Sequence, residues 1–397
     1  MKSEDMTKVQ AARPVSSRLA KLQATVVSLT ASDIAPRAEE VDRACTWPAH
    51  SMAALSKAGL LGLHVPQALG GHEQGLLALS VLTETIAQAC PSSALCFGMH
   101  CVGSAVIAAK ATDLQRTDYL RKIAQGEHIT TLALSEAGSG AHFYLPATLM
   151  TPCDSHLEVN GQKQFVTNGG HADSYVLSVL DGSSEHHSGD FSCLIVDADT
   201  PGLTWSGDWQ GFGMRGNSSR AMALDNARVP TTNLLGEPGD QVWYVFEVVA
   251  PYFLMAMAGT YLGIAEAALN EAREHLKARR HAHSGTALAD HDILQSRLAT
   301  MWISVERTRS FIREAARKGD LGDPAALPFI LASKVDAAET AVAITNEAMT
   351  LCGGSAYREN SRLTQMLRDA RASHVMSPTT DMLKLWTGRA LLDMPLL

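Results

Sequence analysis

Apolar residues recur at helical spacing near both ends of this chain and at strand-like spacing in its middle. Leu19, Leu22, Val26 and Leu29 are three or four positions apart, which places them on one face of a helix. Further helices are predicted over 50–58, 76–90 and 93–110, so that the helical pattern extends from residue 16 to residue 123. Residues 1–15 precede this pattern, and we expect them to form a frayed tail.

From about residue 130 the spacing of apolar residues changes toward two, and turn-forming residues follow at short intervals. A tight type I′ turn is predicted at Asn160-Gly161, and a solvated hairpin loop is predicted over 181–190, which includes His186 and His187. The pattern favours a compact β-barrel or sandwich. The predicted strands are Thr131–Ser135, His156–Val159, Lys163–Thr167, Tyr175–Leu180, Phe191–Asp197, Leu203–Ser206 and Arg220–Val229.

Helical spacing returns after Gly239 and continues to the end of the chain, with helices predicted over 257–279, 298–317, 327–351 and 381–392. Their apolar positions cover broad faces, which suits a bundle and a subunit interface. The sequence therefore predicts an α+β fold with three domains. These are an N-terminal helical domain (1–128), a central β-domain (129–238) and a C-terminal four-helix bundle (239–397).

Two runs without acidic or basic residues, 85–109 and 248–265, are long enough to raise the question of a membrane span. Proline interrupts both, and both are rich in small residues rather than in Leu, Ile and Phe, so we expect buried core helices. The run from Gly211 to Gly216 has the spacing of a dinucleotide-binding loop. A strand-like pattern follows it where that motif requires a helix, so we reject this interpretation.

The net charge and the cysteine spacing indicate which partners and which cellular compartment to expect. The formal net charge of −8, without a long basic run, argues against binding to nucleic acid or to an anionic membrane. The seven cysteines form no Cys-x-x-Cys pair, which predicts reduced thiols in a cytoplasmic protein and no metal site. The N-terminal segment has no continuous apolar stretch of the secretory type.

Several motifs occur in an order that resembles the acyl-CoA dehydrogenase superfamily over nearly the whole chain. The run from Ser135 to His142 is similar to a flavin-binding loop of that family, with Ala137 in place of Pro and His142 in place of Asp. The other matching segments are 62–66 with 70–71, 160–169, 213–216, 226–230, 235–239, 351–357 and 367–371.

The resemblance implies bound FAD. By position, Ser135 and Thr167 would offer hydrogen bonds to the flavin ring, and Phe165 would lie beside it, where many relatives have Trp. Hydrogen-bond donors near the ring raise its electron affinity. Family members bind the rest of FAD partly from a neighbouring subunit, which implies a homodimer or homotetramer. The matching residues are Arg280, Gly353, Gly354 and Thr379.

The chain differs from the family at the position of the catalytic base. Relatives remove the α-proton of an acyl thioester with a Glu, and the matching position here is Ser377. A minority of relatives carry this Glu early in the first C-terminal helix, where this chain has Phe253, next to Leu254 in place of a common Arg. A neutral hydroxyl is too weak a base, so both carboxylate positions are empty.

Three explanations remain open at this point. Another residue could be the base, and we rank His142 first because histidine titrates near neutral pH. The chain could instead be a flavin-dependent monooxygenase using reduced flavin and O2, or a flavin protein without the reaction. We expect an FAD-dependent oxidoreductase that acts on an acyl thioester, of CoA or a carrier protein, or on a related small molecule. The other candidate bases are Asp381, His100, His374 and Glu136.

Overall fold

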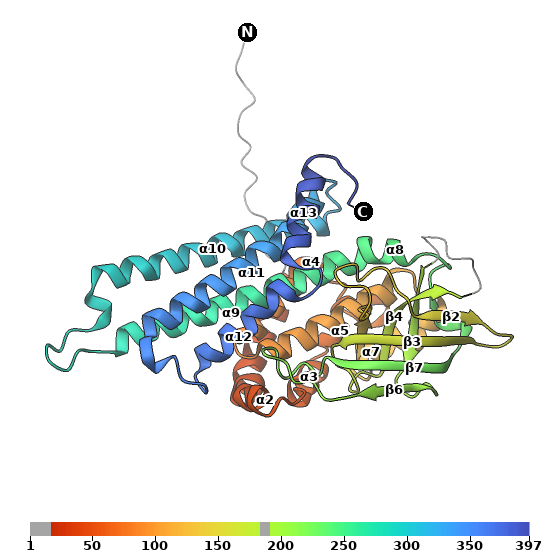
Figure 1. Ribbon diagram of the computed structural model, residues 1–397, viewed down its shortest axis with the longest axis horizontal. Coiled ribbons are helices and arrows are strands. Elements are labelled where there is room, and N and C mark those ends of the chain that lie inside the picture. Colours follow the sequence, from red (N-terminus) through yellow and green to blue (C-terminus); the bar gives the residue numbers. More distant parts are fainter. Residues whose placement is uncertain (1–16, 183–190, 397) are drawn as a thin grey trace, which may run out of the picture.

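The computed structural model of this protein describes residues 17–182 and 191–396. The expected tail at 1–15 and the hairpin loop with His186 and His187 lie outside the described residues. The α+β fold class is confirmed, because helices precede and follow a central sheet domain. Figure 1 shows the long helices extending toward one end of the molecule and the strands gathered at the other.

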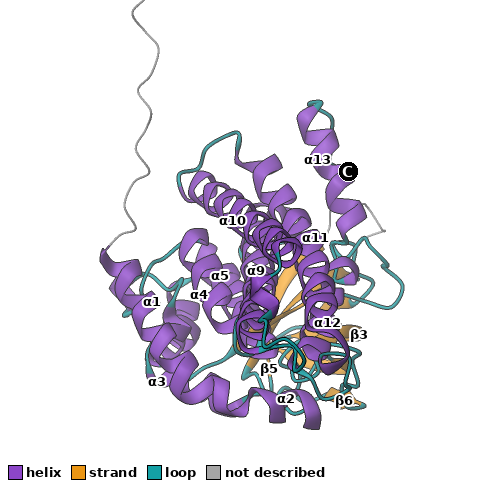
Figure 2. Cartoon of the chain, turned by 90° about the vertical axis from the view of Figure 1, so that its left-hand side faces the viewer, coloured by secondary structure: helices purple, strands orange, loops and turns teal. Residues whose placement is uncertain are grey.

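Helix α9 is the central helix of the structure. Figure 2 shows α4 and α5 on one side of α9, with α11 and α12 on the other. The N-terminal helices are α1 (Ser17–Leu29), α2 (Ala38–Ala44), α3 (Ala49–Lys57), α4 (Leu76–Ala87), α5 (Pro91–Ala109), α6 (Asp113–Gln115) and α7 (Arg121–Gln125). The C-terminal helices are α8 (Gln241–Trp243), α9 (Ala250–Ala278), α10 (Asp292–Asp320), α11 (Ala326–Cys352), α12 (Arg362–Val375) and α13 (Thr380–Leu391).

Small residues explain how α9 and α4 pack so closely. A Cβ atom added at Gly259 would lie 2.3 Å from the Ser80 carbonyl oxygen, and one at Gly263 would lie 2.3 Å from that of Glu84. Helices from both ends of the chain therefore share one hydrophobic core. Within the described residues, two apolar helical segments are long enough to cross a membrane, and each is 89% buried over its apolar window, as expected for core helices.

In the middle of the chain, the described residues (129–182 and 191–238) form one eight-stranded sheet with a separate hydrophobic core. Its order is β6-β7-β3-β2-β4-β5-β8, with β1 paired in parallel to β4. The loop 211–216 leads into strand β7, in agreement with the rejection of a dinucleotide-binding motif. The strands are β1 (Thr130–Ala133), β2 (Leu149–Pro152), β3 (Leu157–Val166), β4 (Ser174–Asp181), β5 (Phe191–Asp197), β6 (Leu203–Ser206), β7 (Arg220–Val229) and β8 (Leu234–Leu235).

The predicted turn at Asn160-Gly161 is wrong. Strand β3 continues through both residues, and its pairing with β7 slips there by one position, which is a β-bulge. Gly161 is needed for close packing, because an added Cβ would lie 2.6 Å from the Thr148 hydroxyl oxygen. The hairpin partner of β3 is the short strand β2, which the sequence pattern did not reveal.

Candidate active site

A cavity of about 580 Å³ lies where the β-domain meets helices α5, α9 and α12. Its walls are mostly apolar, and five residues expected at a flavin site line it. These are Ser135, Phe165, Thr167, Ser377 and Thr379. Residues far apart in the sequence are thus brought to one cavity by the packing of the β-domain on the C-terminal helices.

The β-domain wall presents two hydroxyl groups to the cavity. Thr167 is only 6% exposed, and its hydroxyl oxygen lies 3.2 Å from that of Ser219. Ser135 follows β1, and its backbone carbonyl accepts a hydrogen bond of 2.7 Å from the Gln164 backbone N–H. This bond fixes the loop that begins at Ser135 against strand β3.

Phe165 faces the cavity because strand β3 is irregular just before its end. The pairing with β7 shifts register between Lys163 and Val166, and Phe165 has a positive φ of 56°. A bulge with such a backbone re-aims a side chain out of the normal alternation of a strand. The ring is therefore 65% exposed beside the two hydroxyl groups.

A buried ion pair supports the same wall. The Lys163 ammonium lies 2.6 Å from a Glu136 carboxylate oxygen and also donates to the Ser178 carbonyl oxygen at 2.6 Å. Burial lowers the pKa of Lys163 to about 8, although Glu136 opposes this shift. Burial alone would raise the pKa of Glu136, but Lys163 and its hydrogen-bond donors lower it. Both groups are therefore charged at neutral pH.

The opposite wall is the turn between α12 and α13, and a second buried lysine holds it. Lys334 of helix α11 donates to the Met376 carbonyl oxygen at 3.0 Å and to the Pro378 carbonyl oxygen at 2.9 Å. Burial lowers its pKa to about 7. The Ser377 hydroxyl oxygen in this turn is buried and has no hydrogen-bond partner among the described residues. The signal for Lys334 in the sequence is one lysine within an otherwise apolar helix segment.

The third wall is apolar and is contributed by the helices. Leu95 and Met99 of α5 lie opposite Val249 and Phe253 near the start of α9, and all four line the cavity. Phe253 occupies the alternative carboxylate position named above, whereas Leu254 is fully buried in the helical core. The apolar surface suits an acyl chain, and it contains no carboxylate.

Among the residues that the structure describes, Glu136 is the only carboxylate lining the cavity. Its two oxygens accept hydrogen bonds from Lys163, from the Ala147 backbone N–H and from both the backbone and the hydroxyl group of Thr148. With its acceptor positions used and its pKa lowered, Glu136 is a weak proton acceptor. It instead supports the loop between β1 and β2.

The other candidate bases do not line the cavity. His142 is exposed, with Nδ1 2.8 Å from the Tyr144 hydroxyl, and Asp381 is exposed in the first turn of α13. His100 is fully buried, its Nδ1 accepts from the Thr130 backbone N–H, and burial lowers its pKa to about 4. His374 lies 3.3 Å from the Thr380 hydroxyl, and burial lowers its pKa.

Three of the expected FAD contacts lie elsewhere on the surface. Arg280, Gly353 and Gly354 are exposed and outside the cavity, and Arg280 donates to the Gly285 carbonyl oxygen at 3.1 Å. Thr379 lines the cavity and caps helix α13, because its hydroxyl accepts a hydrogen bond from the Met382 backbone N–H. All seven cysteines are free thiols, as predicted.

The fold is that of a flavin-dependent oxidoreductase. The acyl-CoA dehydrogenase family is matched in three parts: its N-terminal domain over residues 16–127, its middle domain over 131–227 and its C-terminal domain over 251–392. The chain belongs to the acyl-CoA dehydrogenase family. It is an enzyme, and the family supports FAD as its cofactor.

One similar protein is the cyclohex-1-ene-1-carbonyl-CoA dehydrogenase of Geobacter metallireducens, 30% identical over 91% of this chain and 94% of that protein. Among solved structures, butyryl-CoA dehydrogenase from Megasphaera elsdenii has a TM-score of 0.91 at 24% identity, covering 96% of this chain and 100% of the other. The prolyl acyl carrier protein oxidase AnaB has a TM-score of 0.85 at 21% identity, covering 95% and 100%. The two structural matches show a shared fold.

Proposed function

We propose that the cavity holds the flavin ring of FAD and that Ser135, Thr167 and Phe165 contact it. The observation that carries this proposal is the convergence of two hydroxyl groups, an outward-turned aromatic ring and the 375–379 turn on one mostly apolar cavity. The unpartnered Ser377 hydroxyl supports a ligand in the cavity, because buried polar atoms normally have a hydrogen-bond partner. Thr379 also lines the cavity and would hold part of the rest of FAD.

When bound, FAD supplies a two-electron acceptor for a hydride from the substrate. The Ser135 and Thr167 hydroxyl groups would donate hydrogen bonds to the ring and so raise its electron affinity. Leu95, Met99 and Phe253 exclude water from the acyl side of the cavity. The Lys163–Glu136 ion pair keeps the loop that carries Ser135 in position.

The substrate we propose is an acyl thioester with an apolar acyl group, carried by CoA or by a carrier protein. The apolar wall of α5 and α9 supports the acyl group, and two similar proteins are named for CoA and carrier-protein substrates. Leu254, buried where an Arg is common in relatives, favours a carrier other than free CoA.

We further propose that no carboxylate removes a proton at position 377. Ser377 presents a neutral hydroxyl, Phe253 fills the alternative position, and Glu136 is held by other bonds. If the substrate is an acyl thioester, a base outside these three positions must therefore remove its α-proton. His142 and Asp381 stay predicted bases, although they, like His100 and His374, lie outside the residues that line the cavity.

Arg280, Gly353 and Gly354 are proposed to contact the FAD of a neighbouring subunit. Their exposure away from the cavity supports this proposal, because these residues are available to a second copy of the chain. A homodimer or homotetramer follows from it. A cytoplasmic location and the absence of nucleic-acid and membrane partners stay predictions from composition.

The test is an anaerobic screen of the purified FAD-loaded protein against acyl-CoAs and acyl carrier proteins. We expect at least one thioester to bleach the flavin absorbance without any added reductase. Bleaching only with a reductase or reduced flavin would instead indicate the monooxygenase alternative. Absence of bleaching by any thioester or reductant would contradict an oxidoreductase function.

A further inference from the structure

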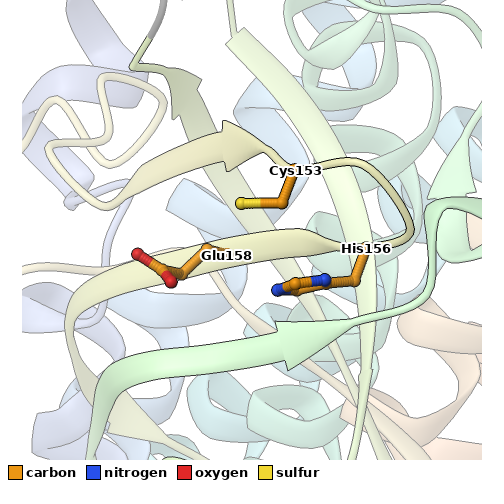
Figure 3. Close-up of side chains that lie close together, drawn as sticks. All are labelled: Cys153, His156 and Glu158. Atoms are coloured by element: carbon orange, nitrogen blue, oxygen red, sulfur yellow. The ribbon is translucent and has the colours of Figure 1, made fainter.

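The tip of the β2–β3 hairpin gathers three side chains that the proposed reaction does not use. Cys153, His156 and Glu158 each offer one ligand atom, and the thiol sulfur, an imidazole nitrogen and a carboxylate oxygen all lie within 4.8 Å of one another. Figure 3 shows the three side chains close together along the two strands of the hairpin. We propose that they bind one zinc ion.

The backbone of the hairpin creates this cluster from a short Cys-x-x-His-x-Glu segment. The Cys153 backbone N–H donates to the His156 carbonyl oxygen at 2.8 Å, which closes a four-residue turn between β2 and β3. The turn brings Cys153 back beside His156. Glu158 is two residues further along β3, and because side chains of a strand alternate, it shares a face with His156.

The donor set is one that zinc uses in proteins. Zinc takes thiolate, imidazole and carboxylate ligands in a tetrahedral arrangement, with ligand atoms about 3.5 Å apart. The three ligand atoms, which lie within 4.8 Å of one another, would have to move closer together to bind the ion. A bound Cys153 thiolate and the Glu158 carboxylate would balance the two positive charges of the ion. Water would take the fourth position.

The present contacts of the three side chains are long and easily exchanged. The Cys153 sulfur lies 3.9 Å from the Thr151 carbonyl oxygen, and His156 Nδ1 lies 3.5 Å from the Ser155 hydroxyl. Glu158 accepts a hydrogen bond of 3.3 Å from the Asn160 side chain. Arg228 of β7 lies opposite Glu158 in the sheet register, and its positive charge is the feature that opposes a cation here.

The site is independent of the proposed flavin cavity. Glu158 and Thr167 are near opposite ends of β3, about 30 Å apart along an extended strand. Zinc at the hairpin tip would hold β2 to β3 and would not touch the cavity. Loss of zinc binding and loss of flavin chemistry can therefore be measured separately.

The test is calorimetric titration of the full FAD-loaded chain, without an affinity tag, with Zn²⁺. We expect one zinc ion per chain, with binding weakened at least about 100-fold in Cys153→Ser and in His156→Gln. Ser155→Ala in the same turn and Cys45→Ser, another half-buried thiol, are matched controls that should bind zinc normally. FAD content per chain verifies that each variant is folded.

The proposal is overturned if the wild-type chain binds no zinc at a ratio of one per chain. It is equally overturned if Cys153→Ser or His156→Gln weakens zinc binding by less than about tenfold. Even the loss of a residue that only hydrogen-bonds to a metal ligand weakens metal binding by about this factor. Retained FAD with lost zinc binding supports the site regardless of what the flavin experiment shows.

Discussion

Two buried lysines hold opposite walls of the same cavity, and their partners differ. Lys163 in the β-domain faces the Glu136 carboxylate, whereas Lys334 under the 375–379 turn contacts two backbone carbonyl groups. Burial lowers both pKa values, to about 8 for Lys163 and about 7 for Lys334. The Glu136 charge opposes this shift at Lys163, whereas the shift at Lys334 is caused by burial.

The difference assigns separate roles to the two walls. The β-domain wall is fixed by opposite charges, so removing one charge leaves the other buried and unpaired. The helical wall is fixed by dipoles, so its lysine is the group whose protonation changes near neutral pH. Replacing each lysine in turn distinguishes the wall held by an ion pair from the wall held by backbone carbonyl groups.

The largest effect is expected for Lys163→Met. This change leaves the Glu136 carboxylate buried without its counter-charge and should lower the free energy of unfolding by about 3–5 kcal/mol. Denaturant unfolding measures the loss. The matched control is the double variant Glu136→Gln with Lys163→Met, which should recover part of it. A loss below about 1 kcal/mol would show that the pair behaves as an exposed one.

Lys334→Met should cost less, about 1–3 kcal/mol, because two carbonyl groups lose their donor but no charge is left unpaired. The 375–379 turn should loosen, so flavin affinity should fall as well. The control is Lys318→Met in α10, which removes an ion pair with Asp323, should cost no more than about 1 kcal/mol and should leave flavin affinity unchanged. Unchanged flavin affinity in Lys334→Met would mean that this turn does not form part of the flavin site.

The pH dependence of the same variant tests the charge state of Lys334. Between about pH 7 and the usual lysine pKa of 10.5, the unfolded chain holds the proton and the folded chain does not. The unfolded state then binds more protons, so wild-type stability relative to Lys334→Met should rise with pH across this window. Below about pH 7 both states are protonated and the difference should be constant. A difference that falls between pH 7 and 10 would contradict the lowered pKa.

Thr167→Val should have a smaller effect that is confined to the flavin. The change removes one hydroxyl from the cavity and keeps the side-chain shape. We expect weaker FAD binding or a lower reduction potential, because one hydrogen bond to the flavin is lost. The loss should be about 1 kcal/mol. Spectroscopic titration and redox potentiometry measure both. An unchanged FAD affinity and an unchanged reduction potential would show that the Thr167 hydroxyl does not contact the flavin.

The smallest effect is expected for Ser377→Ala, which should leave turnover nearly intact because a neutral hydroxyl is not the base. Ser377→Glu is the informative counterpart. It places a carboxylate where relatives carry one, and it should raise thioester oxidation. Loss of turnover in the folded Ser377→Ala variant would give Ser377 a chemical role.

The sequence predicted the parts of the site that depend on local pattern and family resemblance. Ser135, Phe165, Thr167, Ser377 and Thr379 were expected together, and one cavity collects them. Strands β5, β6 and β7 were predicted with their observed bounds from the pattern of apolar residues.

The sequence could not predict features that depend on distant contacts. Asn160-Gly161 has the pattern of a turn, but Thr148 packs against Gly161 and the strand continues. Phe165 faces outward because of a bulge that its neighbours alone do not specify. Lys334 binds carbonyl groups 42 and 44 residues away, which carry no side-chain signal.

A crystal structure of the FAD-loaded protein tests the central claim most directly. The flavin ring should lie next to Phe165, within hydrogen-bond distance of the Ser135 and Thr167 hydroxyl groups. Its other side should face Ser377, and no carboxylate should lie within reach of the substrate's α-carbon. A ring bound elsewhere, or this cavity filled by side chains with FAD present, would contradict the account.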